Sequence, residues 1–341
     1  MKKRYKALLA AMLTGALAAG CLAGCGKMDG TAGGKMKKVT LNEVAHSIFY
    51  APQYAAIELG YFEEEGIDLT LVNGAGADKV MTALISGDAQ IGFMGSEASI
   101  YVSQEGADDP AVNFAQLTQR AGNFLVGRTA QPDFKWEDLK GKKVLGGRAG
   151  GMPQMVFEYI LKKNGLDPVN DLTIDQSISF GLTAAAFTSS AADYTIEFEP
   201  FATTLEMEGS GAVVASLGTE SGYVPYTAYS ARKSYLKQHP EVIQSFTNAI
   251  QKGLDYVNSH SSEEIAKVIS PHFKETPVDK LALIVDRYKS QDTWKEDTVF
   301  EENSFTLLKR ILEEAGELKA EVPYNELVTM DFSKKAAKNS Q

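Results

Sequence analysis

Apolar residues alternate along the chain between a period of two and a period close to 3.6, which is typical of an α/β protein. The segments 39–44 and 67–72 follow the strand period. Between them, Pro52 stands where a helix would begin and Gly60 where it would end. We therefore expect consecutive strand–helix–strand units.

The same succession is repeated in the middle of the chain. The first series continues with an expected helix at 78–86, a strand at 91–94 and a helix at 97–104. The second series contains expected strands at 143–146, 172–174, 194–198 and 213–217 and expected helices at 154–164 and 184–191. Each series is expected to form one mixed sheet flanked by helices, which predicts two lobes.

The last third of the chain is mostly helical in pattern. Apolar residues keep a four-residue rhythm over 240–258, and a further helix is expected at 305–315. Ser261 followed by Glu264 predicts a capping box at the start of another helix. Two lobes with a helical C-terminal region predict a ligand cleft between the lobes. The chain is expected to cross between them near 119–127 and 218–227 and to close by a hinge motion.

The first 25 residues have the features of a bacterial lipoprotein signal. Four basic residues precede the uncharged run 7–22, which is too short and too rich in Ala and Gly for a good membrane-spanning helix. The run ends in the letters LAGC at 22–25, which look like a lipobox, and Cys21 is a second candidate. The alternative is a plain signal peptide with two incidental cysteines. Acyl chains such as palmitate on Cys25 would anchor the protein at the cell membrane on its extracytoplasmic face.

These observations predict four parts of the chain. The signal peptide is expected at 1–24, and the lipidated cysteine with a flexible tether at 25–38. The first lobe is expected to comprise 39–122 together with 224–341, and the second lobe 123–223.

Charge and cysteine usage exclude several function classes. Loss of the signal removes four basic groups and shifts the net charge from −10 to −14, which argues against nucleic-acid binding. Both cysteines lie in the leader, so the globular part has no disulfide, thiol nucleophile or thiolate metal site. The four histidines have no metal-type spacing, and no hydrolase elbow, zinc-protease motif or phosphate-binding loop is present. We expect no cofactor and no enzymatic activity.

A group of short motifs carries a family resemblance. The most specific are YAPQYAA at 50–56 and GYFEEEGI at 60–67. Supporting motifs follow in order: GAGAD at 74–78, ALISGDAQIG at 83–92, DLKGKKV at 138–144 and the pair Glu199-Pro200. Together they resemble substrate-binding proteins of ABC importers, in the branch of sulfonate, taurine, nitrate and thiamine-precursor binders, known as SsuA/THI5-like or NMT1-like. Gln90 and the turn 190–193 depart from the usual pattern.

The resemblance implies a two-lobed fold of the periplasmic-binding-protein type, type II, and a set of partners. These are a small-molecule solute, an ABC permease and, through the permease, its ATPase. A monomer is expected. Eukaryotic relatives of this fold make a thiamine pyrimidine with a cysteine-rich motif, which the globular part of this chain lacks.

Ligands of open α/β sheets bind beyond the carboxyl ends of strands and near helix N-termini, a rule that selects five loops here. The first contains Ser47, Phe49 and Tyr50, whose rings could stack on a flat ligand or pack under the loop. In the second, Gly76 allows close backbone approach, and Asp78 could contact the ligand or only cap a helix.

The third loop contains Ser96, placed to donate a hydroxyl hydrogen bond to the ligand, and Glu97. Glu97 either faces the cleft, where it would favour N–H donors or positive charge, or is simply stabilised at a helix start. The fourth loop contains Gly150 and Gly151, which are expected to expose backbone N–H groups. Beside them, Arg148 either pairs with an anion or is solvated.

The fifth loop contains Glu197 and Glu199. The family resemblance implies that Glu199 lies near the ligand. The alternative is that it caps the following helix and braces the hinge. Tyr223 and Tyr226, near the return crossover, are further aromatic candidates, with core packing as the alternative.

Two acidic candidates, several aromatic rings and at most one nearby arginine favour a flat, nitrogen-containing solute such as a pyrimidine or thiamine precursor. Buried carboxylates would repel a sulfonate. Two alternatives stay open. One is a binding protein for an alkanesulfonate, taurine or nitrate. The other is the ligand-binding subunit of a surface sensor or adhesin.

Overall fold

The computed structural model describes residues 35–178 and 181–340. Lys35–Gln341 form one compact unit. Cys21, Cys25 and the rest of the expected leader lie outside the described residues. Within the described ranges, no helix is both long and apolar enough to span a membrane.

The first sheet is built from two separate parts of the chain. Its strands are β1 (Lys37–Glu43), β2 (Ile67–Asn73), β3 (Ile91–Gly95), β4 (Ala111–Thr118) and β10 (Thr227–Arg232). Their order is β2-β1-β3-β10-β4, with β10 antiparallel to both of its neighbours. β3 and β4 are buried along their whole length because helices cover both faces.

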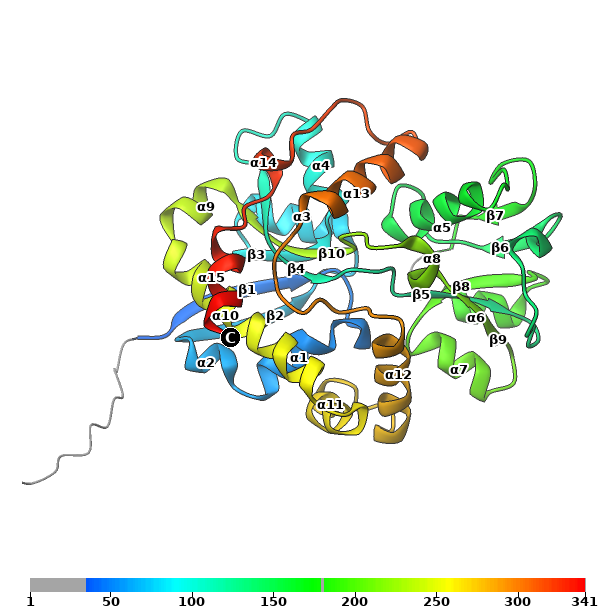
Figure 1. Ribbon diagram of the computed structural model, residues 1–341, viewed down its shortest axis with the longest axis horizontal. Helices are drawn as coiled ribbons and strands as arrows, with labels where there is room; N and C mark the ends of the chain where they lie inside the picture. Colours follow the sequence, from blue (N-terminus) through cyan, green and yellow to red (C-terminus); the bar gives the residue numbers. More distant parts are fainter. Residues whose placement is uncertain (1–34, 179–180, 341) are drawn as a thin grey trace, which may run out of the picture. The chain divides into compact units, whose positions relative to one another are not determined.

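The second sheet has the same plan and lies on the right in Figure 1. Its strands are β5 (Asn123–Gly127), β6 (Lys143–Leu145), β7 (Thr173–Asp175), β8 (Tyr194–Phe198) and β9 (Ala212–Ser216). Their order is β7-β6-β8-β5-β9, and β5 runs antiparallel to β8 and β9. The mixed α/β architecture with two helix-flanked sheets is therefore confirmed.

Helices connect consecutive strands in both sheets. Around the first sheet they are α1 (Ala51–Glu58), α2 (Tyr61–Glu64), α3 (Ala77–Ser86) and α4 (Glu97–Gln104), preceded by the short 3-10 helix η1 (Ile48–Tyr50). Around the second sheet they are η2 (Trp136–Leu139), α5 (Met152–Lys163), α6 (Thr183–Ser189), α7 (Phe201–Met207) and α8 (Leu217–Ser221). The helix expected at 97–104 matches α4.

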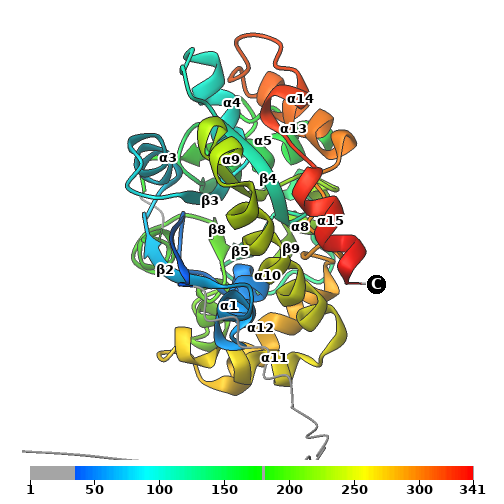
Figure 2. The same ribbon diagram turned by 90° about the vertical axis from the view of Figure 1, so that its left-hand side faces the viewer.

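The C-terminal third packs mainly on the first sheet. Its helices are α9 (Lys233–Gln238), α10 (Pro240–Ser259), α11 (Ser262–Ile269), η3 (Ser270–His272), α12 (Val278–Ser290), α13 (Glu302–Glu314), α14 (Tyr324–Leu327) and α15 (Asp331–Asn339). The long helix α10 contacts α1, α2 and α15 (Figure 2). The capping box of Ser261 and Glu264 at the start of α11 is confirmed.

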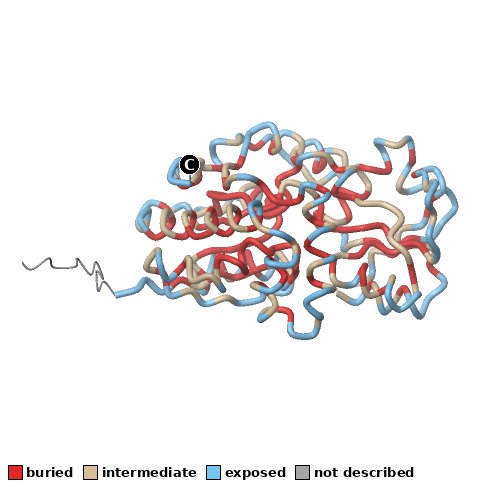
Figure 3. The backbone as a smooth tube through the Cα atoms, turned by 60° about the horizontal axis from the view of Figure 1, so that its bottom comes forward, coloured by how far each residue is buried: buried red, intermediate tan, exposed pale blue. Residues whose placement is uncertain are grey.

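One continuous hydrophobic cluster includes buried residues around both sheets. Figure 3 shows the buried segments in the interior of each half and also where the two halves meet. A smaller cluster beneath α3 contains Val80, Met81 and Leu84. Because the core is shared, the two halves are held together by apolar packing as well as by the connecting chain.

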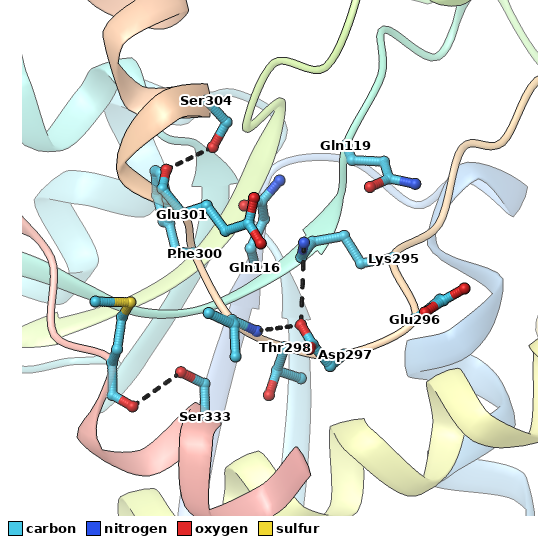
Figure 4. A network of polar contacts seen from close by, with 12 residues as sticks. Gln116, Gln119, Lys295, Glu296, Asp297, Thr298, Phe300, Glu301, Ser304 and Ser333 are labelled. Carbon is cyan, nitrogen blue, oxygen red and sulfur yellow. Dashed lines mark hydrogen bonds and ion pairs between the residues drawn. The ribbon is translucent and has the colours of Figure 1, made fainter.

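The chain passes from the first sheet to the second between β4 and β5 and returns between β9 and β10. Both passages lie in the segments expected from the sequence. A third segment, which follows α12, was not predicted. It runs beside the end of β4 and the start of the first passage, and Figure 4 shows Lys295–Thr298 of this segment near Gln116 and Gln119. Trp294 bridges to Thr118, and the Thr298 carbonyl accepts the Gln116 N–H at 2.9 Å.

We propose that the two halves are the expected lobes, with 39–122 and 224–341 forming the first lobe and 123–223 the second. The two passages between the sheets then form the hinge, and the segment that follows α12 packs beside them. Gln291, just after α12, supports this assignment because its side-chain amide donates to the Ala121 carbonyl at 3.1 Å and accepts from the Ser216 hydroxyl at 2.6 Å.

Candidate functional site

The carboxyl ends of β3, β6 and β8 bring loops of both lobes together. We use "interlobe site" for the cluster of Tyr50, Ser96, Glu97, Asn123 and Tyr226, all of which are buried. Ser96 and Glu97 come from the β3–α4 turn, and Tyr226 directly precedes β10. Thr227 of β10 pairs with Gly95 of β3, which places the turn and Tyr226 next to each other.

Glu97 is the least satisfied charged residue of the interlobe site. Its side chain is 4 % exposed, and its Oε2 atom has no hydrogen-bond partner among the described residues. Burial raises its pKa to about 7, while its own N–H, the Met152 N–H and the Arg148 guanidinium lower it. Gly95 makes room for the carboxylate, because a Cβ there would lie 2.6 Å from Oε1. One oxygen of this buried carboxylate therefore lacks a hydrogen-bond partner, which is costly for a buried charge.

The Ser96 hydroxyl does not point to a ligand. It donates to the Pro225 carbonyl in the return passage, and the Ser96 carbonyl accepts from the Ser99 hydroxyl at 2.8 Å. The expectation that Ser96 donates to the solute is therefore wrong in this conformation. Its hydroxyl instead fixes the turn that carries Glu97 against the return passage.

Aromatic rings fill the space beside the carboxylate. Phe49 is fully buried and packs on Tyr226 edge-to-face, with ring centroids 5.6 Å apart, and on Tyr288 at 5.4 Å. Tyr50 lies edge-on to Phe93 with ring centroids 4.5 Å apart. Phe49 therefore belongs to the core of the hinge, where it meets the backbone of Gly122, whose Cβ would lie 2.5 Å from the ring. Tyr50 keeps its place beside Glu97, whose charge contributes to the raised pKa of the tyrosine.

The glycines of the second-lobe loop do not present free N–H groups. The Gly150 N–H donates to the Gln154 side chain at 3.0 Å, and the Gly151 N–H donates to the Arg148 carbonyl at 3.2 Å. The expectation that both N–H groups face the ligand is therefore wrong. Gly150 instead takes part in a contact between the lobes, because its carbonyl accepts from the Tyr101 hydroxyl at 2.9 Å. Its φ of 73° is one that glycine adopts without strain.

A second contact between the lobes closes the edge of the site. Arg148 Nη1 lies 3.3 Å from Asp78 Oδ1, and both side chains are 59 % exposed. Asp78 lies in the first turn of α3 but does not cap it, since the N-cap residue is Gly76. Gly76 has a φ of 141° and turns the chain into α3. The two lobes therefore touch at this edge through a solvated ion pair.

Ser47 lies on another side of the hinge. Its hydroxyl caps η1 by accepting the Phe49 N–H at 3.3 Å and donates to the Glu199 carbonyl of the second lobe at 3.3 Å. Ser47 and Glu199 both line a cavity of about 270 Å³, together with His46, Phe198, Pro200, Phe201 and residues 272–276.

The glutamate near the end of β8, Glu197, and the one that follows the strand, Glu199, have different partners. Glu197 accepts from the Thr183 and Thr195 hydroxyls at 3.0 and 2.6 Å, and burial raises its pKa to about 7. Glu199 is paired with Arg287 Nη1 at 2.6 Å and accepts the Thr203 N–H in the first turn of α7 at 3.0 Å, although Pro200 is the N-cap residue. Its carboxylate is therefore already satisfied within the protein.

A family model described as NMT1/THI5 like matches residues 47–264. This range contains the β3–α4 turn, both passages between the sheets and the loop after β8. The chain belongs to the NMT1/THI5-like family.

Two relatives show how widely this family varies. The chain is 45% identical over 300 residues to YtlA of Bacillus subtilis (strain 168), which is described as a binding protein, and the match covers 88% of this chain and 90% of YtlA. It is 23% identical over 227 residues to the 4-amino-5-hydroxymethyl-2-methylpyrimidine phosphate synthase THI5 of Saccharomyces cerevisiae (strain ATCC 204508 / S288c). That match covers 61% of this chain and 63% of the yeast protein.

Solved structures share the fold at low sequence identity. The periplasmic nitrate-binding protein NrtA from Synechocystis PCC 6803 matches with a TM-score of 0.72 at 16% identity and covers 89% of each chain. The ligand-binding component of an ABC-type import system from Staphylococcus aureus, with zinc bound, matches with a TM-score of 0.71 at 17% identity, covering 88% of this chain and 99% of its own. The fold is therefore that of the periplasmic binding proteins. In residues 35–178 and 181–340, no group of three or more His, Cys, Asp or Glu side chains could hold a metal ion.

Three residues of the site were not singled out from the sequence. Tyr101 joins the lobes through Gly150, Arg287 neutralises Glu199, and Asn123 contacts Tyr226. Tyr101 lies in the helix expected at 97–104, where nothing in the pattern marks it as a contact between lobes, and no element was predicted around Arg287. Asn123 could have been found as a lone amide beside the apolar run of the first passage.

Proposed function

We propose that this NMT1/THI5-like protein is an extracytoplasmic solute-binding protein of an ABC importer, and that it captures a small nitrogen-containing ring such as a pyrimidine or thiamine precursor. The single observation that carries the ligand class is the buried Glu97 carboxylate with its unpaired Oε2 atom. A solute N–H donor would satisfy that oxygen, whereas an anion would meet a second negative charge in a low-dielectric site.

The neighbours of Glu97 support a flat ligand. Tyr50 and Tyr226 are buried rings with hydroxyl groups, close enough to Glu97 for its charge to act on both. Flat rings gain from such contacts both by burial and by edge or face interactions. The yeast relatives that act in pyrimidine synthesis are consistent with this ligand class, since their names contain an aminopyrimidine.

The protein would deliver its solute to a permease and, through the permease, draw on an ATPase. We propose that Cys25 carries the lipid anchor and that the chain works as a monomer without a cofactor. We further propose that it is not an enzyme, because the interlobe site holds a single unsatisfied ionisable group. Acid–base chemistry commonly needs a second group with a different pKa.

The function is tested by a thermal-shift screen of residues 26–341, which contain the whole compact unit. The ligands are 4-amino-5-hydroxymethyl-2-methylpyrimidine, thiamine, an alkanesulfonate, taurine and nitrate. A ligand at 100 times its Kd stabilises the folded state by about 2.7 kcal/mol and so raises Tm. We expect a shift with the aminopyrimidine that Glu97→Gln reduces and Glu105→Gln leaves unchanged.

Other outcomes separate the alternatives. A shift with nitrate or a sulfonate alone would contradict the ligand class and show that Glu97 does not face the solute. Product formation from the bound pyrimidine would contradict the binding-only role. Absence of any shift would contradict the ligand class, leave the importer role standing and strengthen the sensor and adhesin alternatives.

The anchor is tested on the full chain in a bacterial host. We expect Cys25→Ala to release the protein from the membrane fraction and Cys21→Ala to leave it bound. Release by Cys21→Ala alone would place the lipid on the other cysteine.

A further inference from the structure

Asn123 is a buried polar residue for which neither the fold nor the proposed function supplies a full set of partners. It is the first residue of β5, directly after the chain passes from the first lobe to the second. Its side chain is 0 % exposed. The Tyr226 hydroxyl approaches its Oδ1 at 3.5 Å, while its Nδ2 has no hydrogen-bond partner among the described residues.

An unpaired amide is unusual at this position. Most buried side-chain polar atoms in proteins have a hydrogen-bond partner, and an unmet donor is costly. The pairing of β5 with β8 does not need the asparagine side chain, because Asn123 pairs with Phe198 through main-chain atoms. A leucine would fill the same space with no unmet donor. The unpaired Nδ2 is therefore best explained by a partner that arrives from outside the chain.

Asn123 and Glu97 come from different elements, and Tyr226 relates them. Its hydroxyl donates to Asn123 Oδ1 at 3.5 Å, and its backbone lies beside the Ser96–Glu97 turn through the Ser96–Pro225 hydrogen bond and the Thr227–Gly95 pairing. Burial raises the pKa of Tyr226, and the charge of Glu97 adds to that shift. An unpaired donor, Asn123 Nδ2, and an unpaired acceptor, Glu97 Oε2, therefore both belong to the surroundings of Tyr226.

We propose that Asn123 is a specificity-determining residue whose amide N–H donates to a ring nitrogen of the solute while Glu97 accepts from the neighbouring amino group. The recognised edge is an amino donor next to a ring-nitrogen acceptor, as in a 4-aminopyrimidine. This inference rests on the proposed function and adds the second half of the recognition. Nitrate and sulfonates, which carry only acceptors, cannot satisfy both residues.

The test combines one protein change with one ligand change. The ligands are 4-amino-5-hydroxymethyl-2-methylpyrimidine and the analogue in which the ring nitrogen between the amino and methyl carbons is replaced by C–H. Kd is measured by titration calorimetry for the wild type, Asn123→Leu and the control Asn248→Leu, which alters a half-buried asparagine of α10 whose side-chain partners are Glu65 and Gln244. The quantity of interest is the ratio of the analogue Kd to the pyrimidine Kd.

We expect this ratio to be at least tenfold larger in the wild type than in Asn123→Leu, which corresponds to about 1.4 kcal/mol of coupling between Asn123 and the ring nitrogen. If Asn123→Leu does not fold, Asn123→Asp keeps the size and removes the N–H donor, and the same loss of ratio is expected. Asn248→Leu should keep the wild-type ratio.

Two results would overturn the inference in distinguishable ways. An unchanged ratio in a folded Asn123 variant that still binds the pyrimidine would refute the role of Asn123 and leave the proposed function standing. Failure of the folded wild type to bind the pyrimidine would refute the ligand class itself, and this inference with it.

Discussion

Replacement of Glu97 by Gln is expected to stabilise the ligand-free protein, and to do so only at high pH. The folded protein holds the Glu97 proton with a pKa of about 7, against an ordinary value of 4.5. Between these values the folded state binds more protons than the unfolded state, so stability falls as pH rises. Below pH 4.5 the contribution of Glu97 is fully present, and above pH 7 it is lost.

The magnitude follows from the size of the shift. A difference between 4.5 and about 7, at about 1.4 kcal/mol for each pH unit, gives about 3 kcal/mol. Glu97→Gln keeps the shape of the side chain but cannot ionise. The difference in unfolding free energy between variant and wild type should therefore grow by about 3 kcal/mol from pH 4.5 to pH 8. Glu197, which also titrates near pH 7, is present in both proteins and cancels.

The assay is urea denaturation followed by circular dichroism at several pH values. Glu105→Gln is the matched control because Glu105 directly follows α4 and is exposed. Its stability curve should run parallel to that of the wild type. A Glu97→Gln curve that is also parallel to the wild type would refute the reasoning, since it would mean that Glu97 is ionised at no cost in the folded state.

Three further substitutions test other parts of the structure. Arg287→Met leaves the fully buried Glu199 carboxylate without its cation. The unfolding free energy measured by denaturation should therefore fall by about 3 kcal/mol at pH 8 and by less at pH 5. Equal losses at the two pH values would contradict the pairing. Gly253→Ala should lower stability by about 1–3 kcal/mol, although alanine is the better helix former, because its Cβ would clash with the backbone carbonyl oxygen of Pro52 where α10 packs on α1. A rise in Tm would refute that close packing. Arg148→Gln should change stability by less than about 1 kcal/mol, since its ion pair is solvated, but should speed solute release in stopped-flow measurements at low salt. An unchanged release rate would mean that the ion pair does not hold the lobes together.

Local patterns were sufficient to predict most of the fold. α4 and β8 depend on periodicity and on terminal residues within the segment itself, and both match their predicted bounds. β4 was not predicted, because three of its eight residues are polar although all are buried. Remote partners make that possible. Asn113, for example, donates to Ser99 and accepts from Ser230, which lie in other elements.

The candidate site was predictable in its loops but not in its pairings. The rule that ligands bind beyond the carboxyl ends of strands was enough to predict the loops that contain Ser96, Glu97 and Gly150. Residues far away in the chain decide which polar atoms of these loops stay unpaired. The Pro225 carbonyl, for example, accepts a hydrogen bond from the Ser96 hydroxyl. The same holds for Glu199, whose partner Arg287 lies 88 positions away. A carboxylate that is satisfied and one that is not therefore look alike in sequence.

The central claim is that Glu97 accepts a hydrogen bond from a bound aminopyrimidine. Titration calorimetry at pH 7, in two buffers of different protonation enthalpy, tests it by counting protons exchanged on binding. Because a solute N–H stabilises the ionised carboxylate, its pKa of about 7 should fall on binding. We predict that 4-amino-5-hydroxymethyl-2-methylpyrimidine binds with release of up to about half a proton, and that Glu97→Gln abolishes this release. Binding with no difference in proton release between wild type and Glu97→Gln, or no binding at all, would contradict the account.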